Sequence, residues 1–303
     1  MLSHRLKLRL PLLVAALSVA GAASANYPAT PDDLRGMASL VCSGVIVRAN
    51  RGPDQPAVLL TNGHCATNAS IDPDDALVDV PYSRGGDLGV YVGGDTPETM
   101  KPSRILYATR TGLDVALIEL KVTYRELEAK GAKIYEMAKN DAKPGSDVQL
   151  VSGFWKEKNL CAVSHLVPSL VEDVWTTRDA YAMNDPCPTT GGWSGTPMVD
   201  PTSLEVVGIL NSTNLAGQLC TLDNPCEVSS DGTRLAFNGR TYGQRVSPIL
   251  NCLSTNGDVV LTQAGCGLTR PKPRPTTETK QPEPEPSPSP TSTAKPSSSW
   301  PKR

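Results

Sequence analysis

Three residues of different types could together hydrolyse an ester or peptide bond. His64 stands in TNGHC, and histidine is the usual general base at neutral pH. Asp114 opens the apolar run DVALIEL, where a buried carboxylate can orient an imidazole. Ser194 stands in GGWSGTPM, whose glycines free the backbone to point N–H groups at a developing oxyanion. Each residue alone fits a packed histidine, a turn aspartate or a loop serine; together they predict a nucleophilic hydrolase.

The elements that must position these residues are short strands. Apolar runs broken by Gly, Pro, Asn and Asp occupy residues 40–47, 58–61, 77–80, 89–92 and 115–120, and then 148–154, 161–167, 171–176, 195–199 and 206–210. Many short strands at this spacing favour an all-β sandwich or barrel. Thr123 and Glu126 form a capping box for one helix that Gly131 ends. Ser247, as N-cap, with Pro248 predicts a short C-terminal helix.

The two ends of the chain differ from its middle. Residues 1–25 have a basic start, a short apolar run and the motif Ala23-Ser24-Ala25, which predicts a signal peptide cleaved before Asn26. No later run is apolar enough to span a membrane. Residues 269–303 are rich in Pro, Ser and Thr and are expected to form a disordered, extended spacer. We therefore expect one folded domain over residues 26–268.

Composition removes several classes of function. The net charge of −2 provides no field for nucleic acid or an acidic membrane. Thr196 breaks the Gly-x-Ser-x-Gly pattern of lipases and esterases. No spacing of Cys and His suggests zinc, so we expect no metal and no cofactor. Export to an oxidising compartment makes the 8 cysteines candidates for disulfides, although eight allow 105 connectivities.

The chain resembles the chymotrypsin-like, or trypsin-like, serine endopeptidases. The matching pieces are CSGVIV (residues 42–47), TNGHC (61–65), DVALIEL (114–120) and GWSGTP (192–197), in the order His, Asp, Ser. The resemblance implies two six-stranded antiparallel barrels, about 37–122 and 143–253, with a short C-terminal helix and a triad in the cleft between them. It makes His64 the general base, Asp114 its orienting carboxylate and Ser194 the nucleophile that forms an acyl-enzyme. The amides of Gly192 and Ser194 become the oxyanion hole.

The resemblance also locates a specificity pocket and a bridge. It places Pro188 and Thr189 near the pocket base, with Asn211, Ser212 and Thr213 along its wall. No Asp is present there to bind a basic side chain, so a small or apolar preference is the default expectation. The family bridge corresponds to Cys42–Cys65. The simplest pairings of the other cysteines are Cys161–Cys187, Cys220–Cys226 and Cys252–Cys266.

Trp193 departs from the family pattern. The family usually has an aspartate there, which in animal members pairs with a newly cleaved amino terminus. We therefore expect no such activation switch, and expect the indole to pack beneath the loop. The sequence predicts a monomeric, secreted endopeptidase that acts on proteins or peptides. A further hypothesis is that its C-terminal tail associates with the cell wall. The alternative is a catalytically inactive homologue that binds protein or cell-wall polymer. The presence of all three triad residues favours the enzyme.

Overall fold

The computed structural model describes residues 25–273. The proposed signal segment up to residue 24 and the tail from residue 274 lie outside the described residues. The packed unit runs through Lys272. Within the described residues, no helix is both long enough and apolar enough to cross a membrane.

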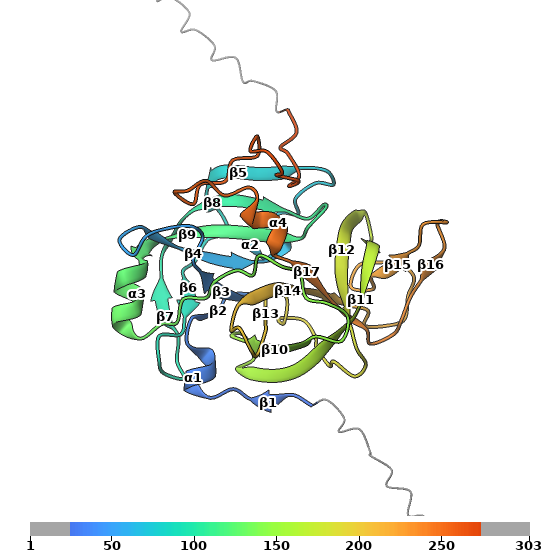
Figure 1. Ribbon diagram of the computed structural model, residues 1–303, viewed down its shortest axis with the longest axis horizontal. Helices are drawn as coiled ribbons and strands as arrows, with labels where there is room; N and C mark the ends of the chain where they lie inside the picture. Colours follow the sequence, from blue (N-terminus) through green and yellow to red (C-terminus); the bar gives the residue numbers. More distant parts are fainter. Residues whose placement is uncertain (1–24, 274–303) are drawn as a thin grey trace, which may run out of the picture. The chain divides into compact units, whose positions relative to one another are not determined.

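The first sheet contains eight antiparallel strands. In chain order they are β2 (Met37–Ser39), β3 (Ser43–Val47), β4 (Pro56–Thr61), β5 (Ala76–Pro81), β6 (Leu88–Val90), β7 (Glu98–Met100), β8 (Pro102–Thr109) and β9 (Val115–Thr123). Their order across the sheet is β5-β8-β9-β4-β3-β2-β6-β7. Figure 1 shows β5, β8, β9 and β4 following one another in this order.

The second sheet contains nine strands, six of which close a ring. The strands are β1 (Tyr27–Pro28), β10 (Asp147–Ser152), β11 (Glu157–Glu172), β12 (Trp175–Met183), β13 (Pro197–Val199), β14 (Val206–Thr213), β15 (Cys226–Val228), β16 (Arg234–Leu235) and β17 (Thr241–Arg245). The ring runs β10-β13-β14-β17-β12-β11 and closes because β11 also pairs with β10. β1 adds to β11, and β15 and β16 form a hairpin extending from the ring (Figure 1).

The prediction of an all-β fold with two antiparallel sheets is confirmed. The expected six strands describe the closed ring of the second sheet, to which β1, β15 and β16 are added. The first sheet has eight strands instead of six, because the turn-rich segment after β5 forms the extra short strands β6 and β7.

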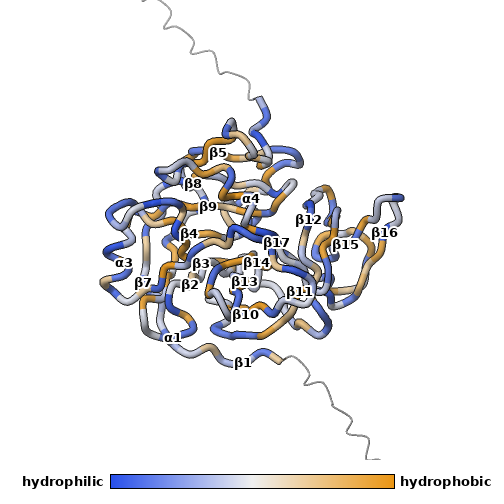
Figure 2. Tube along the Cα trace, viewed as in Figure 1, coloured by the Kyte–Doolittle hydropathy of each residue, from blue (hydrophilic) through white to orange (hydrophobic). Residues whose placement is uncertain are grey.

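The apolar runs are continuous because the central strands of the first sheet are buried on both faces. On β9, Ile118 packs in the core of the first sheet, whereas Leu117 packs in a second core shared with the other sheet. Ile209 of β14 lies in that shared core. Figure 2 shows the apolar residues concentrated along these strands. Burial on both faces explains why the sequence shows no polar alternation here.

The described residues form four short helices, three between strands and one after the last strand: α1 (Pro31–Leu34), α2 (Gly63–Ala66), α3 (Tyr124–Lys130) and α4 (Ser247–Leu250). The predicted capping box of α3 is present: Thr123 accepts from the Glu126 amide, and Glu126 accepts from the Thr123 amide at 2.8 Å. Gly131 ends α3 in the left-handed conformation, as expected.

The expected N-cap of α4 is wrong by one residue. Val246 is the N-cap, and it makes no side-chain capping bond. Ser247 is instead the first residue of the helix, and its hydroxyl donates to Asp141.

Burial and hydrogen bonds connect residues 268–272 to preceding segments of the chain. Leu268 is buried, and the Thr269 hydroxyl donates to the Thr111 carbonyl at 2.6 Å. The Lys272 amide donates to Asp75 at 2.7 Å. These bonds attach residues 269–272 to the domain, although their composition resembles that of the tail.

All eight cysteines are paired as expected. The bridges are Cys42–Cys65, Cys161–Cys187, Cys220–Cys226 and Cys252–Cys266.

Candidate active site

His64 is presented by α2, a single helical turn after β4. Two preceding residues fix this turn: the Thr61 hydroxyl donates to the Ser43 carbonyl at 2.7 Å, and the Asn62 amide group donates to the Asp114 carbonyl at 2.7 Å. A Cβ on Gly63 would lie 1.9 Å from the Thr109 carbonyl oxygen. Thr61, Asn62 and Gly63, which precede His64, are therefore each required by a contact with another segment of the chain.

His64 and Asp114 form a close pair. Asp114 Oδ2 lies 2.6 Å from His64 Nδ1, and Oδ1 accepts from the His64 amide at 3.1 Å. Burial by itself raises the pKa of Asp114, but the His64 contacts and the Arg110 charge outweigh it and hold the pKa below its usual range. An ionised carboxylate at Nδ1 keeps a proton on that nitrogen and leaves Nε2 as the basic one.

The loop that carries Asp114 is attached to the second sheet. The Gly112 amide donates to the Thr176 carbonyl at 2.9 Å, and the Gly112 carbonyl accepts from the Arg178 amide at 2.8 Å. Both partners belong to β12. The position of Asp114 therefore depends on both sheets.

Arg110, on the same loop, lies against an aromatic ring. Its guanidinium is 3.6 Å from the Trp175 ring centroid, a distance typical of cation–π stacking. The Trp175 indole N–H donates to the Ile71 carbonyl at 2.9 Å. Trp175 thus connects β12 to two segments of the first half of the chain. Sequence reasoning did not identify either Arg110 or Trp175.

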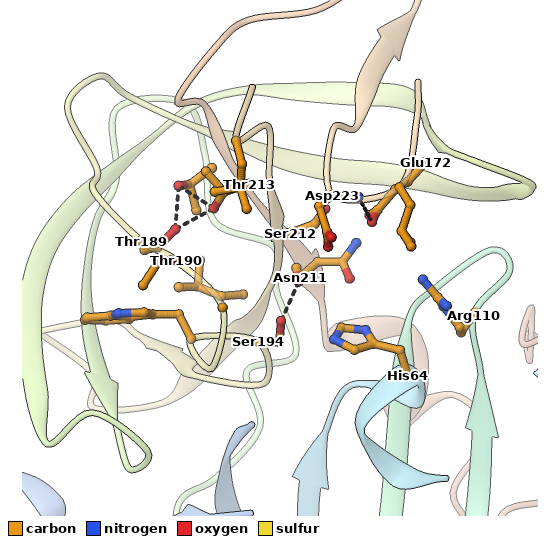
Figure 3. A pocket seen from close by; sticks show the side chains of 16 residues that line it. His64, Arg110, Glu172, Thr189, Thr190, Ser194, Asn211, Ser212, Thr213 and Asp223 are labelled. Atoms are coloured by element: carbon orange, nitrogen blue, oxygen red, sulfur yellow. Dashed lines mark hydrogen bonds between the residues drawn. The ribbon is translucent and has the colours of Figure 1, made fainter. Parts of the chain in front are cut away.

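Ser194 shares one cavity with His64. The cavity measures about 250 Å³ and includes both residues in its lining. The Ser194 hydroxyl donates to the Asn211 carbonyl at 3.1 Å, and not to His64 (Figure 3). A rotation about its side-chain torsion is needed before Ser194 can donate to Nε2. Catalytic hydrogen bonds are often loose until substrate binds.

Two backbone amides near Ser194 are free to bind an anion. In the part of the chain that the structure describes, the N–H groups of Gly192 and Ser194 donate no hydrogen bond, whereas the amide of Trp193 donates to the Thr190 carbonyl and that of Gly195 to the Leu210 carbonyl. Two free donors on either side of one residue form the arrangement that an oxyanion requires.

Side chains from other segments fix the peptide planes around Gly192. The Gly191 carbonyl accepts from the Trp155 indole at 2.8 Å, and the Gly192 carbonyl accepts from the Ser43 hydroxyl at 3.0 Å. In a trans peptide the N–H points opposite to the carbonyl, so the Gly192 amide points away from Trp155. Gly192 has φ +90°, and a Cβ there would lie 2.6 Å from Phe154, so only glycine fits.

Trp193 is buried beneath this loop, as expected. Its exposed fraction is 2%, and it packs in the core of the second sheet with Cys187, Val163 and Leu210. A surface position for the indole is therefore excluded. Sequence reasoning did not find the additional support from Trp155 and Ser43, because both residues are far from the serine motif in the chain.

The expected specificity-pocket residues divide into two groups. Thr189, Asn211, Ser212 and Thr213 line the cavity. Pro188 is exposed and is not part of the lining, which corrects its expected place at the base. Thr241 of β17 lies there instead, beside Thr189. Its contribution could not be seen in the sequence, since it depends on the pairing of β17 with β14.

Two further ionisable residues, Glu172 and His165, differ in their position relative to the cavity. Glu172 lines the cavity near His64, and burial raises its pKa. His165 Nε2 lies 2.9 Å from Glu227, and His165 is absent from the cavity lining. His165 is therefore a suitable control residue outside the site.

One cluster within residues 25–273 has the composition of a metal site. The ligand atoms of Cys42, His64 and Cys65 lie within 4.8 Å of one another. Both sulfurs are joined in a disulfide, so neither is the thiolate that zinc requires. The cluster does not fit a metal.

Comparisons with known proteins give similar structures and a family. The solved structures that resemble the chain include the following three. They are the serine protease domain of the Sesbania mosaic virus polyprotein (16% identity, TM-score 0.44, 76% of this chain and 98% of that one), the MamO protease domain from Magnetospirillum magneticum (14%, 0.46, 73% and 97%) and a Nocardiopsis protease (15%, 0.41, 72% and 94%). No curated protein matches the sequence. The family model described as trypsin-like peptidase domain matches residues 42–209, which is more than half of the chain, and the chain therefore belongs to the trypsin-like peptidase family.

Proposed function

We propose that the protein is a secreted serine endopeptidase with Ser194, His64 and Asp114 as its triad. The observation that carries the proposal is the joint geometry of one site. The 2.6 Å contact of His64 with Asp114, the Ser194 hydroxyl in the same cavity and the free amides of Gly192 and Ser194 are the parts that acyl transfer needs.

The reaction would follow from these parts. After rotating towards Nε2, the Ser194 hydroxyl gives its proton to His64 as its oxygen attacks the substrate carbonyl carbon. The negative charge on the carbonyl oxygen is stabilised by the amides of Gly192 and Ser194. The tetrahedral intermediate then breaks the C–N bond, and His64 returns the proton to the leaving amine. Water repeats the sequence on the acyl-enzyme and releases the acid.

Four disulfides within a trypsin-like fold are consistent with an extracellular protein, because such bridges persist in oxidising compartments. This supports the signal peptide expected over residues 1–25. Protein or peptide substrates are the class that the family implies.

One observation favours a second candidate, an inactive homologue that binds a protein or polymer. The Ser194 hydroxyl is occupied by the Asn211 carbonyl. A permanent bond of this kind would leave Ser194 unable to attack.

A fluorophosphonate probe and casein hydrolysis separate the two candidates. We expect the folded protein to be labelled at Ser194 and to cleave casein. Ser194→Ala and His64→Ala should each lower turnover on the order of 10⁶-fold, because triad members act as a unit. His165→Gln, outside the site, should stay within a few-fold of wild type. Absence of labelling, or casein cleavage by Ser194→Ala, contradicts the proposal.

A further inference from the structure

Three threonine hydroxyls meet at the end of the cavity that lies away from His64. Thr189 Oγ1 is 2.5 Å from Thr213 Oγ1 and 2.8 Å from Thr241 Oγ1, and the last two are 3.1 Å apart. Thr189 precedes the nucleophile, Thr213 ends β14 and Thr241 begins β17. Figure 3 shows these contacts on the opposite side of Ser194 from His64. This group of three residues is called the threonine floor below.

Counting protons shows that the threonine floor lacks donors. Each hydroxyl has one proton. The proton of Thr241 is directed to the Cys187 carbonyl at 2.9 Å, since a carbonyl can only accept. Two protons, from Thr189 and Thr213, remain for three oxygen–oxygen contacts. At least one contact therefore has no proton.

Two arrangements place one proton in the shortest contact, between Thr189 and Thr213, and also donate a proton to the Thr241 oxygen. In one, Thr213 donates to Thr189, which donates to Thr241. In the other, Thr189 donates to Thr213, which donates to Thr241. Either arrangement leaves the oxygen of its first member with no donor, and no proton is left for a ligand. The threonine floor is thus an acceptor towards whatever enters the cavity.

The rest of this end of the cavity has no charge. Thr190, Gly191, Trp193 and Leu210, which also line the cavity, carry no charge. The charged lining residues Arg110, Glu172 and Asp223 lie on the side of Ser194 where His64 lies (Figure 3). Nothing at the threonine end can therefore pair with a charged side chain.

We propose that the threonine floor selects substrates in which the residue at the acyl side of the cleaved bond has an uncharged hydrogen-bond donor, namely Ser, Thr, Asn or Gln. This inference rests on the endopeptidase function proposed above. A carboxylate has only acceptors and would face oxygens whose protons are already used. An ammonium or guanidinium group would be desolvated without a carboxylate partner. An aliphatic side chain would leave the acceptor unpaired. The small or apolar default from the sequence is replaced by a polar one.

Isosteric substrate pairs test the proposal on the wild-type protein. Quenched peptides that differ only at this residue, as Gln or Glu, Asn or Asp, and Thr or Val, are compared by kcat/KM, with Lys as a further member. We expect Gln, Asn and Thr to exceed their partners by at least about five-fold, the effect of one unpaired neutral acceptor. Equal or higher values for Glu, Asp, Val or Lys overturn the proposal.

A triple variant tests the residues themselves. Replacing one or two of the three threonines leaves a floor oxygen as acceptor, Thr241 included, so the informative change removes all three hydroxyls. In Thr189→Val/Thr213→Val/Thr241→Val, the Thr over Val preference should fall to about two-fold or less. Thr202→Val, in an exposed turn, is the matched control and should keep the wild-type preference. Retention of the preference by a folded triple variant overturns the assignment.

Fluorophosphonate labelling separates a failure of the proposed endopeptidase function from a failure of the substrate preference assigned to the threonine floor. The probe reports Ser194 reactivity without a peptide side chain in the pocket. Loss of Ser194-dependent labelling in the wild-type protein refutes the proposed function. Normal labelling with inverted substrate preferences refutes only the role of the threonine floor.

Discussion

Trp155→Phe tests whether the indole N–H holds the oxyanion-binding loop. The change keeps an aromatic ring beside Phe154, with which Trp155 packs edge to face, and removes only the donor to the Gly191 carbonyl. That bond is 2.8 Å long, and Trp155 is 45% exposed. A neutral bond of this kind contributes about 0.5–1.5 kcal/mol, and partial exposure favours the lower half of that range.

The expected kinetic effect follows from that energy. If the bond biases the Gly191–Gly192 peptide towards the orientation that binds the oxyanion, its loss should lower kcat for a peptide amide by roughly two- to five-fold. Complete loss of an oxyanion donor costs about 10²–10³-fold, so the predicted effect is smaller because Ser43 still binds the Gly192 carbonyl. KM should change little, since the interaction matters mainly in the transition state.

Steady-state kinetics of an amide substrate, with a thermal melt of the same samples, provide the measurement. The melting temperature should shift by no more than a few degrees, which separates positioning from unfolding. Unchanged kcat, or an increase in KM with kcat intact, would refute the role given to Trp155. Trp155→His, which restores a ring N–H, should recover part of the lost kcat if its donor reaches Gly191.

Other perturbations have equally definite outcomes. Asp114→Asn should lower kcat on the order of 10⁴-fold through the wrong imidazole tautomer, with normal folding by circular dichroism. Trp193→Ala should lower the free energy of unfolding by about 3–5 kcal/mol in a denaturant titration. Extra residues before Asn26 should leave activity unchanged; activity that appears only after those residues are trimmed would contradict the account of Trp193. Burial raises the pKa of Glu119, but hydrogen bonds from Arg104, Ser103 and Arg51 outweigh burial and lower the pKa. The ionised Glu119 therefore stabilises the folded protein fully above the unfolded pKa of about 4.3, and this stabilisation is lost as pH falls through the folded pKa. Glu119→Gln should cost about 3 kcal/mol at pH 7 and progressively less below pH 4, while Asp54→Asn, at an exposed ion pair, should leave the melting temperature nearly unchanged.

Local sequence was enough to predict features that depend on neighbouring residues. His64, Asp114 and Ser194 were each selected from a short motif of adjacent residues, although the structural role of a flanking residue such as Gly63 depends on a distant segment, here Thr109. The capping box of α3 is another example, since both partners lie within one turn.

Features assembled from distant segments were missed. Trp155 reaches Gly191 across 36 residues, and Thr241 reaches Thr189 across 52. No local pattern marks either contact, because each depends on how the second sheet closes. Pro188 was misplaced for the same reason: spacing from the serine gives a position along the chain and not the direction in which the side chain points.

The attachment of the Gly112 loop to β12 has a consequence for dividing the molecule. A fragment ending in the connection between β9 and β10 would contain His64 and Asp114 but no oxyanion donors, and the remaining fragment would contain Ser194 without a base. Under the function proposed above, neither piece could turn over substrate by itself, and Asp114 would lack the strand that holds its loop. Bringing the two pieces together through fused partner proteins would restore the complete set of catalytic groups and the contact between β12 and the Gly112 loop. The connection after α3 is therefore a natural cut point for a split-enzyme reporter, in which proteolysis signals that two fused proteins have met.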